Sequence, residues 1–168
     1  FSNFQPLNTL GKHSVYSKIF IIALWFLHGF LSINALVGGG LLMIQPDGSL
    51  LGMQKNWLGN SVFSDYFIPG FLLFTMIGLC SLICLIGLIR KPQWYWAHRL
   101  NLYKNIHWSW AFSIYTGIIS IAWIIIQQIM THYFWIQSLI LSVGLLILIC
   151  TLHPIVIERF KQIHKTND

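Results

Sequence analysis

The chain has 168 residues, of which 56% are hydrophobic and 8% are charged. Soluble domains carry about a quarter charged residues, so this composition excludes a soluble globular protein and predicts that lipid surrounds much of the surface. The net charge of +6 does not indicate nucleic-acid binding, because no basic run is interleaved with base-stacking aromatic residues.

Four long apolar segments follow one another along the chain. We place membrane spans at residues 19–44, 67–89, 106–130 and 136–157, each long enough to cross the hydrocarbon core as a helix. Residues 1–18 are expected to form an irregular or interfacial lead-in. The spans leave no room for a separate soluble domain, so residues 1–168 are predicted to form one integral membrane domain, an all-α four-helix transmembrane bundle.

The basic residues are distributed unevenly between the two sides of the predicted membrane. One side holds Lys12, Lys18, Arg90, Lys91, Arg99, Lys104, Arg159, Lys161 and Lys165. Only Lys55 lies on the other side, in the connection between the first and second spans. The positive-inside rule then predicts a multi-pass protein with both termini in the cytoplasm.

The first outer connection, residues 45–66, contains strong turn signals. Pro46 and Gly48 flank Asp47, which is a turn pattern, and a short interfacial helix is expected to follow around Gly52. Ser64 or Asp65 is placed to cap the next helix. We expect this loop to be structured and to pack over the bundle.

Glycines flank this loop on both sides. Gly38, Gly39 and Gly40 end the first span, and Gly70 follows Pro69 at the start of the second. Proline is favourable in the first turn of a helix, where its missing N–H would be unpaired anyway. Because glycine has no side chain, it allows another backbone to approach closely.

Polar side chains inside the spans are costly and often functional. His28 shares a small, polar helix face that should point into the bundle, so it forms either an interhelical hydrogen bond or a ligand- or proton-binding group. Asn34 lies further along the same span. Gln127 and Gln128, near the outer end of the third span, either bond loop backbone or bind a polar ligand.

No catalytic motif is found in the sequence. The spans contain no carboxylate, which removes the usual group for proton relays and for paired acid–base catalysis. A haem site needs paired imidazoles at matched depth, and His28 differs in depth from His107 and His153. We therefore predict a protein that is not an enzyme, with no cofactor and no metal site.

The loop and the third span resemble a family of small four-span bacterial integral membrane proteins that are uncharacterised. The resemblance is carried by residues 38–40, 46–53 and 63–70, by Trp123-Ile124 with Gln127, and by Gln137. It covers about residues 28–150. It implies the bacterial inner membrane and assigns no activity.

Three hypotheses for function remain open at this point. The first is a non-enzymatic accessory or interaction module, with the lipid bilayer and a homo-oligomer or another membrane protein as partners. The second is a protein that binds or transports a lipophilic ligand or a solute, with the glycine-rich end of the first span, Asp65, Gln127 and Gln128 lining an outward-facing cavity. The third is a haem- or quinone-linked redox subunit that uses His28.

Overall fold

The computed structural model describes residues 7–58 and 61–161, and its regular secondary structure there is helical apart from one isolated bridge between Ile106 and Lys161. Four helices are long and apolar enough to span a membrane: Val15–Ile44, Phe67–Arg90, Trp108–Met130 and Trp135–Leu152. The predicted all-α fold with four spans is confirmed, and the chain is a multi-pass membrane protein.

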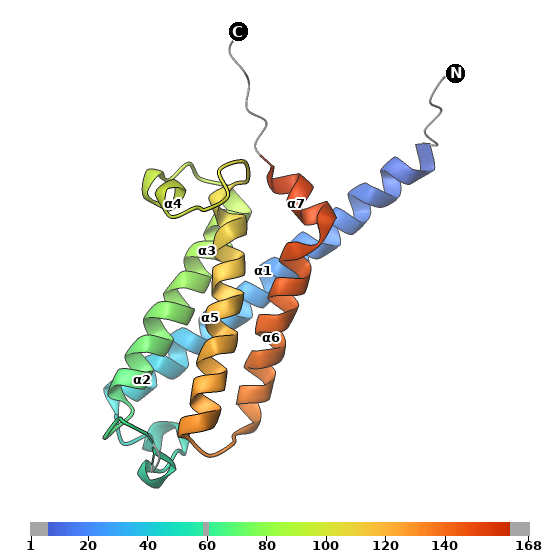
Figure 1. Ribbon diagram of the computed structural model, residues 1–168. Helices are drawn as coiled ribbons and strands as arrows, with labels where there is room; N and C mark the ends of the chain where they lie inside the picture. The colour runs from blue at the N-terminus through green and yellow to red at the C-terminus, as the bar shows by residue number, and fades with distance from the viewer. Residues whose placement is uncertain (1–6, 59–60, 162–168) are drawn as a thin grey trace.

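The four spans form a bundle joined by short elements (Figure 1). The spans are α1 (Leu7–Ile44), then α2 (Phe67–Leu72) continued by η3 (Leu73–Leu79) and α3 (Cys80–Arg90), then α5 (Trp108–Met130) and α6 (Trp135–Leu152). The short elements are η1 (Ser49–Leu51), η2 (Lys55–Leu58), α4 (Tyr95–Arg99) and α7 (Pro154–Phe160). The start of α1 and the end of α7 lie at one end of the bundle, the termini end. Residues 45–58 and 61–66 lie at the opposite end, the loop end.

The boundaries of two spans differ from the sequence-based prediction. The first helix begins at Leu7, so the described part of the expected irregular lead-in is helical. The fourth span ends at Leu152 and not at residue 157, because Pro154 has no N–H to continue the hydrogen-bond ladder. His153 takes an extended conformation there, and α7 begins at Pro154.

The loop between the first two spans folds as two short 3₁₀ turns, η1 and η2. Gly48 and Gly52 flank η1 with φ angles of 81° and 66°, a left-handed conformation that glycine adopts without steric cost. The Tyr66 N–H donates to the Pro46 carbonyl at 2.9 Å and closes the loop.

The close approach of α1 and α2 depends on two glycines. A Cβ atom on Gly39 would lie 2.6 Å from the Gly70 carbonyl oxygen and 2.7 Å from the Phe74 backbone nitrogen. A Cβ atom on Gly70 would lie 2.6 Å from the Leu42 Cβ. The two helices are therefore in backbone contact, as in other small-residue interfaces in membranes.

The second span is interrupted by the π-helical segment η3. Its seven residues lie against α1, and Ile77 and Gly78 are buried there. Short π-helical segments change the faces that the two flanking α-helical parts present, and they are often found at functional sites.

Gly39→Ala is expected to destabilise the fold by about 1–3 kcal/mol, because the added methyl group overlaps backbone atoms that cannot move independently. Gly40→Ala is the matched control, since the nearest atom to its Cβ is Phe74 Cε2 at 4.0 Å. Apparent melting temperatures in detergent micelles measure the difference. Equal melting temperatures of the two variants would contradict the proposed backbone contact.

His107 caps the N-terminus of α5. Its Nδ1 accepts hydrogen bonds from the Ser109 N–H at 3.3 Å and, when Ser109 donates, from the Ser109 hydroxyl at 2.9 Å. Burial lowers the pKa of His107, and the positive charges of Lys91 and His98 lower it further. The folded state therefore favours the neutral imidazole, which keeps Nδ1 available as an acceptor.

Acidification should weaken this cap. A histidine whose pKa is lowered by folding contributes stability that is present above its unfolded pKa of about 6.5 and is lost as the pH falls through the folded value. We expect the melting temperature to fall between pH 7.5 and pH 5, and to fall less in His107→Asn, because asparagine caps helices without titrating. An equal fall in both proteins would show that other groups cause the pH dependence.

Candidate functional site

The middle of the bundle is held by hydrogen bonds around His28. Its Nδ1 lies 3.0 Å from the Ser81 hydroxyl of α3, and its Nε2 lies 2.8 Å from the Ser113 hydroxyl of α5. The Ser113 hydroxyl lies 2.7 Å from the Thr151 hydroxyl of α6. These side chains are buried, so one hydrogen-bonded cluster links all four spans.

Both ring nitrogens of His28 are therefore occupied by hydroxyl groups of neighbouring helices. The Ser81 hydroxyl also donates to the His28 backbone carbonyl at 3.1 Å. Cys84 adds a contact of 3.6 Å from its sulfur to Nε2. Of the two interpretations left open by the sequence, this geometry corresponds to the interhelical hydrogen bond.

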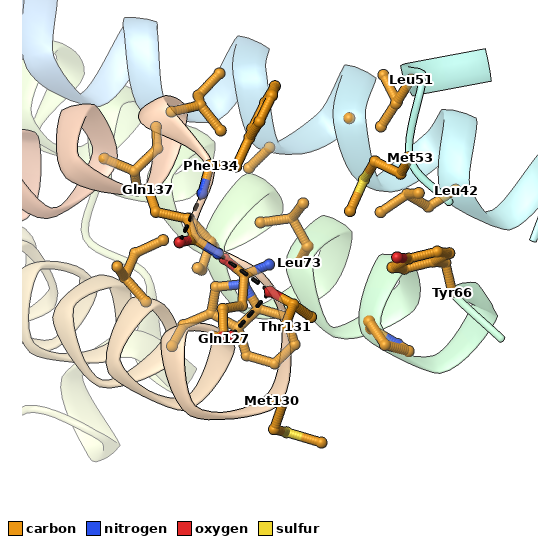
Figure 2. A pocket seen from close by; sticks show the side chains of 18 of the residues that line it. Leu42, Leu51, Met53, Tyr66, Leu73, Gln127, Met130, Thr131, Phe134 and Gln137 are labelled. Atoms are coloured by element: carbon orange, nitrogen blue, oxygen red, sulfur yellow. Dashed lines mark hydrogen bonds between the residues drawn. The ribbon is translucent and has the colours of Figure 1, made fainter. Parts of the chain in front are cut away.

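A cavity of about 490 Å³ lies between His28 and the loop end, within the range of small-molecule sites. α1 contributes Leu31 and Gly38, and η3 contributes Leu73 and Ile77. Figure 2 shows side chains from the loop, from the second span and from the α5–α6 hairpin around this space.

The loop closes the cavity at the loop end. Met53, Trp57 and Leu58 from the loop line it, and Tyr66 packs beneath Gly48, where a Cβ atom would lie 2.9 Å from the tyrosine ring. The Tyr66 hydroxyl donates to the Gln54 carbonyl at 2.9 Å. Burial raises the pKa of the Tyr66 phenol, so the hydroxyl stays protonated and keeps this bond.

The α5–α6 turn forms the opposite wall of the cavity. The Thr131 hydroxyl donates to the Gln127 backbone carbonyl at 2.9 Å and accepts from the Gln137 amide at 3.2 Å. The Gln137 side-chain oxygen accepts from the Phe134 N–H at 3.3 Å. These bonds fix the turn and leave the Gln127 side-chain amide with no hydrogen-bond partner among the described residues (Figure 2).

Some of the predicted site residues line the cavity and others do not. Asn34, Gly38, Pro69 and Gln127 belong to the wall. Asn34 donates from its amide nitrogen to the Phe30 carbonyl at 2.7 Å, which leaves its side-chain oxygen as an acceptor at the wall.

The expectation that Asp65 and Gln128 line the cavity is wrong. The Asp65 carboxylate accepts from the Phe67 N–H at 3.0 Å at the start of α2, and Gln128 is exposed on the outside of α5. The Asp47 carboxylate accepts from the Ser49 N–H at 2.9 Å and helps to shape the loop. His28 lies outside the cavity wall, in the hydrogen-bonded cluster.

Trp123 is a site residue that was not predicted from the sequence. This residue lines the cavity, and its indole Nε1 is buried with no hydrogen-bond partner in the described part of the chain. An unpaired buried donor costs about 1–3 kcal/mol. Its spacing of four from Gln127, which places both on one helix face, is the signal that was available in the sequence.

Residues 7–58 and 61–161 contain no group of three or more His, Cys, Asp or Glu side chains arranged to hold a metal ion. Comparison of the chain with protein-family models, with curated proteins and with solved structures found no significant match. The site is therefore interpreted from its own geometry.

Replacing His28 should loosen the whole bundle. His28→Leu removes the imidazole that joins Ser81 to Ser113, and buried interhelical hydrogen bonds in membranes contribute about 0.6–1.7 kcal/mol each. We expect a loss of about 1–3 kcal/mol, seen as a lower melting temperature in micelles. His132→Leu, at an exposed position of the α5–α6 turn, serves as the control. If both variants melt at the same temperature, the cluster does not hold the helices together.

Proposed function

We propose that this chain is a non-enzymatic membrane protein that binds a lipophilic molecule in the cavity at its loop end. The observation that carries the proposal is a cavity of about 490 Å³ walled by all four spans and the loop. Its volume and its concave, mostly apolar wall are typical of small-molecule binding sites.

The character of the wall supports binding over catalysis. Most lining side chains are aliphatic or aromatic, with polar groups limited to amides, hydroxyls, three indoles and the His132 imidazole. The described residues of the lining include no carboxylate and no thiol, so no nucleophile is paired among them with an acidic residue as in hydrolytic triads. A few polar groups in an apolar wall are typical of sites that orient a ligand.

For the orientation in the membrane, we propose that the termini end faces the cytoplasm. The connection between α3 and α5 carries Lys91, Arg99 and Lys104, and the loop end carries Lys55. This bias supports a cavity on the outer side. The resemblance to small four-span bacterial proteins supports the inner membrane as its location.

A larger side chain at the wall tests the proposal. Gly38 lines the cavity, and a Cβ atom there meets only Leu73 Cδ2 at 3.8 Å. We expect Gly38→Phe to fold and to fill part of the cavity. Native mass spectrometry of protein purified from membranes in mild detergent should show a small-molecule adduct on the wild type, and its occupancy should fall at least about tenfold in Gly38→Phe, a loss of about 1.4 kcal/mol.

Gly40→Phe is the matched control, because Gly40 lies on the same helix and is not part of the wall. This variant should keep the adduct of the wild type. A wild-type protein that carries no adduct, or an adduct that both variants retain equally, would refute the proposed binding function.

A further inference from the structure

Two basic segments that are distant in the sequence meet at the termini end. Lys91 follows α3 directly, and Arg159 lies in the last turn of α7. The His107 N–H donates to the Phe160 carbonyl at 2.8 Å, and this bond holds the end of α7 against the connection that contains Lys91. The fold therefore brings Lys91 and Arg159 into one basic cluster.

The Lys91 ammonium group contacts the end of α7. It donates to the Arg159 backbone carbonyl at 3.3 Å and lies 4.2 Å from the centre of the Phe160 ring, which is close enough for a cation–π interaction. Partial burial lowers the pKa of Lys91, and the positive charge of Arg159 lowers it further. Two positive charges thus repel each other here, and a negative charge between them would relieve the repulsion.

The backbone of Lys91 has an unusual conformation. Its φ and ψ angles are both 48°, and no other non-glycine residue in the described part of the chain has a positive φ. Glycine is the usual residue in this left-handed position at the end of a helix, and strained residues are concentrated at functional sites. The conformation therefore favours a role for the lysine side chain that glycine could not fill.

The carboxylates on this side of the spans are too few to neutralise the basic residues. Within residues 7–58 and 61–161 the only ion pair joins Lys161 to Glu158 at 3.6 Å, so Lys91 and Arg159 have no carboxylate partner there. By sequence, this side holds all but one of the ten basic residues and only two acidic residues, Glu158 and Asp168. An excess of positive charge remains whichever groups these two carboxylates contact.

The basic cluster lies at the depth of the lipid headgroups. The second span ends at Arg90, so Lys91 lies at the interface between membrane and water, where basic residues attract anionic lipids. At the same end of the bundle, Ile89 and Leu152 are 50% and 51% exposed and offer apolar surface to acyl chains. A phospholipid with a net negative charge matches both the charge and the apolar surface.

We propose that Lys91 and Arg159 bind the phosphate group of an anionic phospholipid at the termini end of the bundle. An ammonium group has three N–H donors, and the Arg159 carbonyl accepts from one of them. The planar guanidinium group of Arg159 offers paired donors that fit phosphate oxygens. This site lies at the opposite end of the spans from the cavity, so the inference does not depend on the proposed binding function.

Three probes separate the contributions of the charge and the acyl chains. Dioleoylphosphatidylglycerol has a net negative charge, dioleoylphosphatidylcholine has the same chains without net charge, and glycerophosphoglycerol is the anionic headgroup alone. Native mass spectrometry of the full chain in a neutral detergent gives the affinity for each probe. We expect the wild type to bind phosphatidylglycerol about tenfold more tightly than either of the other two probes, as two basic contacts allow.

Removal of one charge from the basic cluster should reduce this preference. Arg159→Gln and Lys91→Gln should each lower the ratio of the two lipid affinities about threefold to fivefold, and Arg159→Lys should retain most of it. Arg99→Gln is the matched control, because it removes the same charge from α4, where the Arg99 guanidinium lies 5.1 Å from the centre of the Tyr95 ring. Figure 1 shows α4 and α7 on different sides of the termini end, so this variant should keep the preference of the wild type.

Three outcomes would overturn the proposed lipid site. The first is equal binding of the two lipids by the wild type, and the second is an equal loss in Arg99→Gln and Arg159→Gln, which would indicate general electrostatic attraction. The third is binding of the free headgroup as tight as that of the lipid, which would indicate a soluble phosphate compound. Arg159 is exposed, so Arg159→Gln decides the question if Lys91→Gln does not fold. None of these outcomes affects the binding function of the cavity, which Gly38→Phe tests separately.

Discussion

The hydrogen bonds of His28 hold the four spans together near the middle of the bundle. One imidazole contacts hydroxyls on α3 and α5, and Ser113 extends the connection to α6. In hydrocarbon there is no water to replace these partners, so separating the helices here leaves polar groups unpaired. Helices that are joined at one level can diverge on either side of it. On α1 the cavity begins at Leu31, three residues beyond His28 toward the loop end.

Glycine contacts bring the helices together in two pairs. Gly39 and Gly70 keep α1 against α2, while Gly117 and Gly144 bring α5 close to α6, with a Cβ atom on either glycine 3.3 Å from the carbonyl oxygen of the other. The α1–α2 pair is therefore tightly packed near the loop end, and the α5–α6 pair is tightly packed near the middle of the bundle. The cavity lies between the pairs, and it opens at the surface beside Ile33 and Val37 of α1, which line it and are exposed.

Much of the fold could be predicted from the sequence. The apolar segments predicted four spans, although the fourth was drawn past Pro154 to residue 157. These features depend on composition and on single residues, which the sequence displays directly. The helical start of α1 was missed, because a polar segment carries no clear signal when a long helix continues through it.

The site was predictable only in part. Asn34, Gly38 and Gln127 were recognised as unusual within apolar helices, and they line the cavity. Asp65 and Gln128 were assigned to it incorrectly, because the direction of a side chain near a helix end depends on how the helices pair. The π-helical segment η3 and the unpaired donor of Trp123 result from packing, and no local pattern in the chain reveals them.

The first span is longer than the thickness of the bilayer that surrounds it. The apolar part of α1, Val15–Ile44, has 30 residues, or about 45 Å of helix, against a hydrocarbon core of about 30 Å. Such a helix fits only when it is inclined, and its inclination adjusts to bilayer thickness through hydrophobic mismatch. Because α6 has only 18 residues in its span, the two helices respond differently to thickness. The angle between them, and with it the width of the opening, is thus coupled to the membrane in which the protein resides.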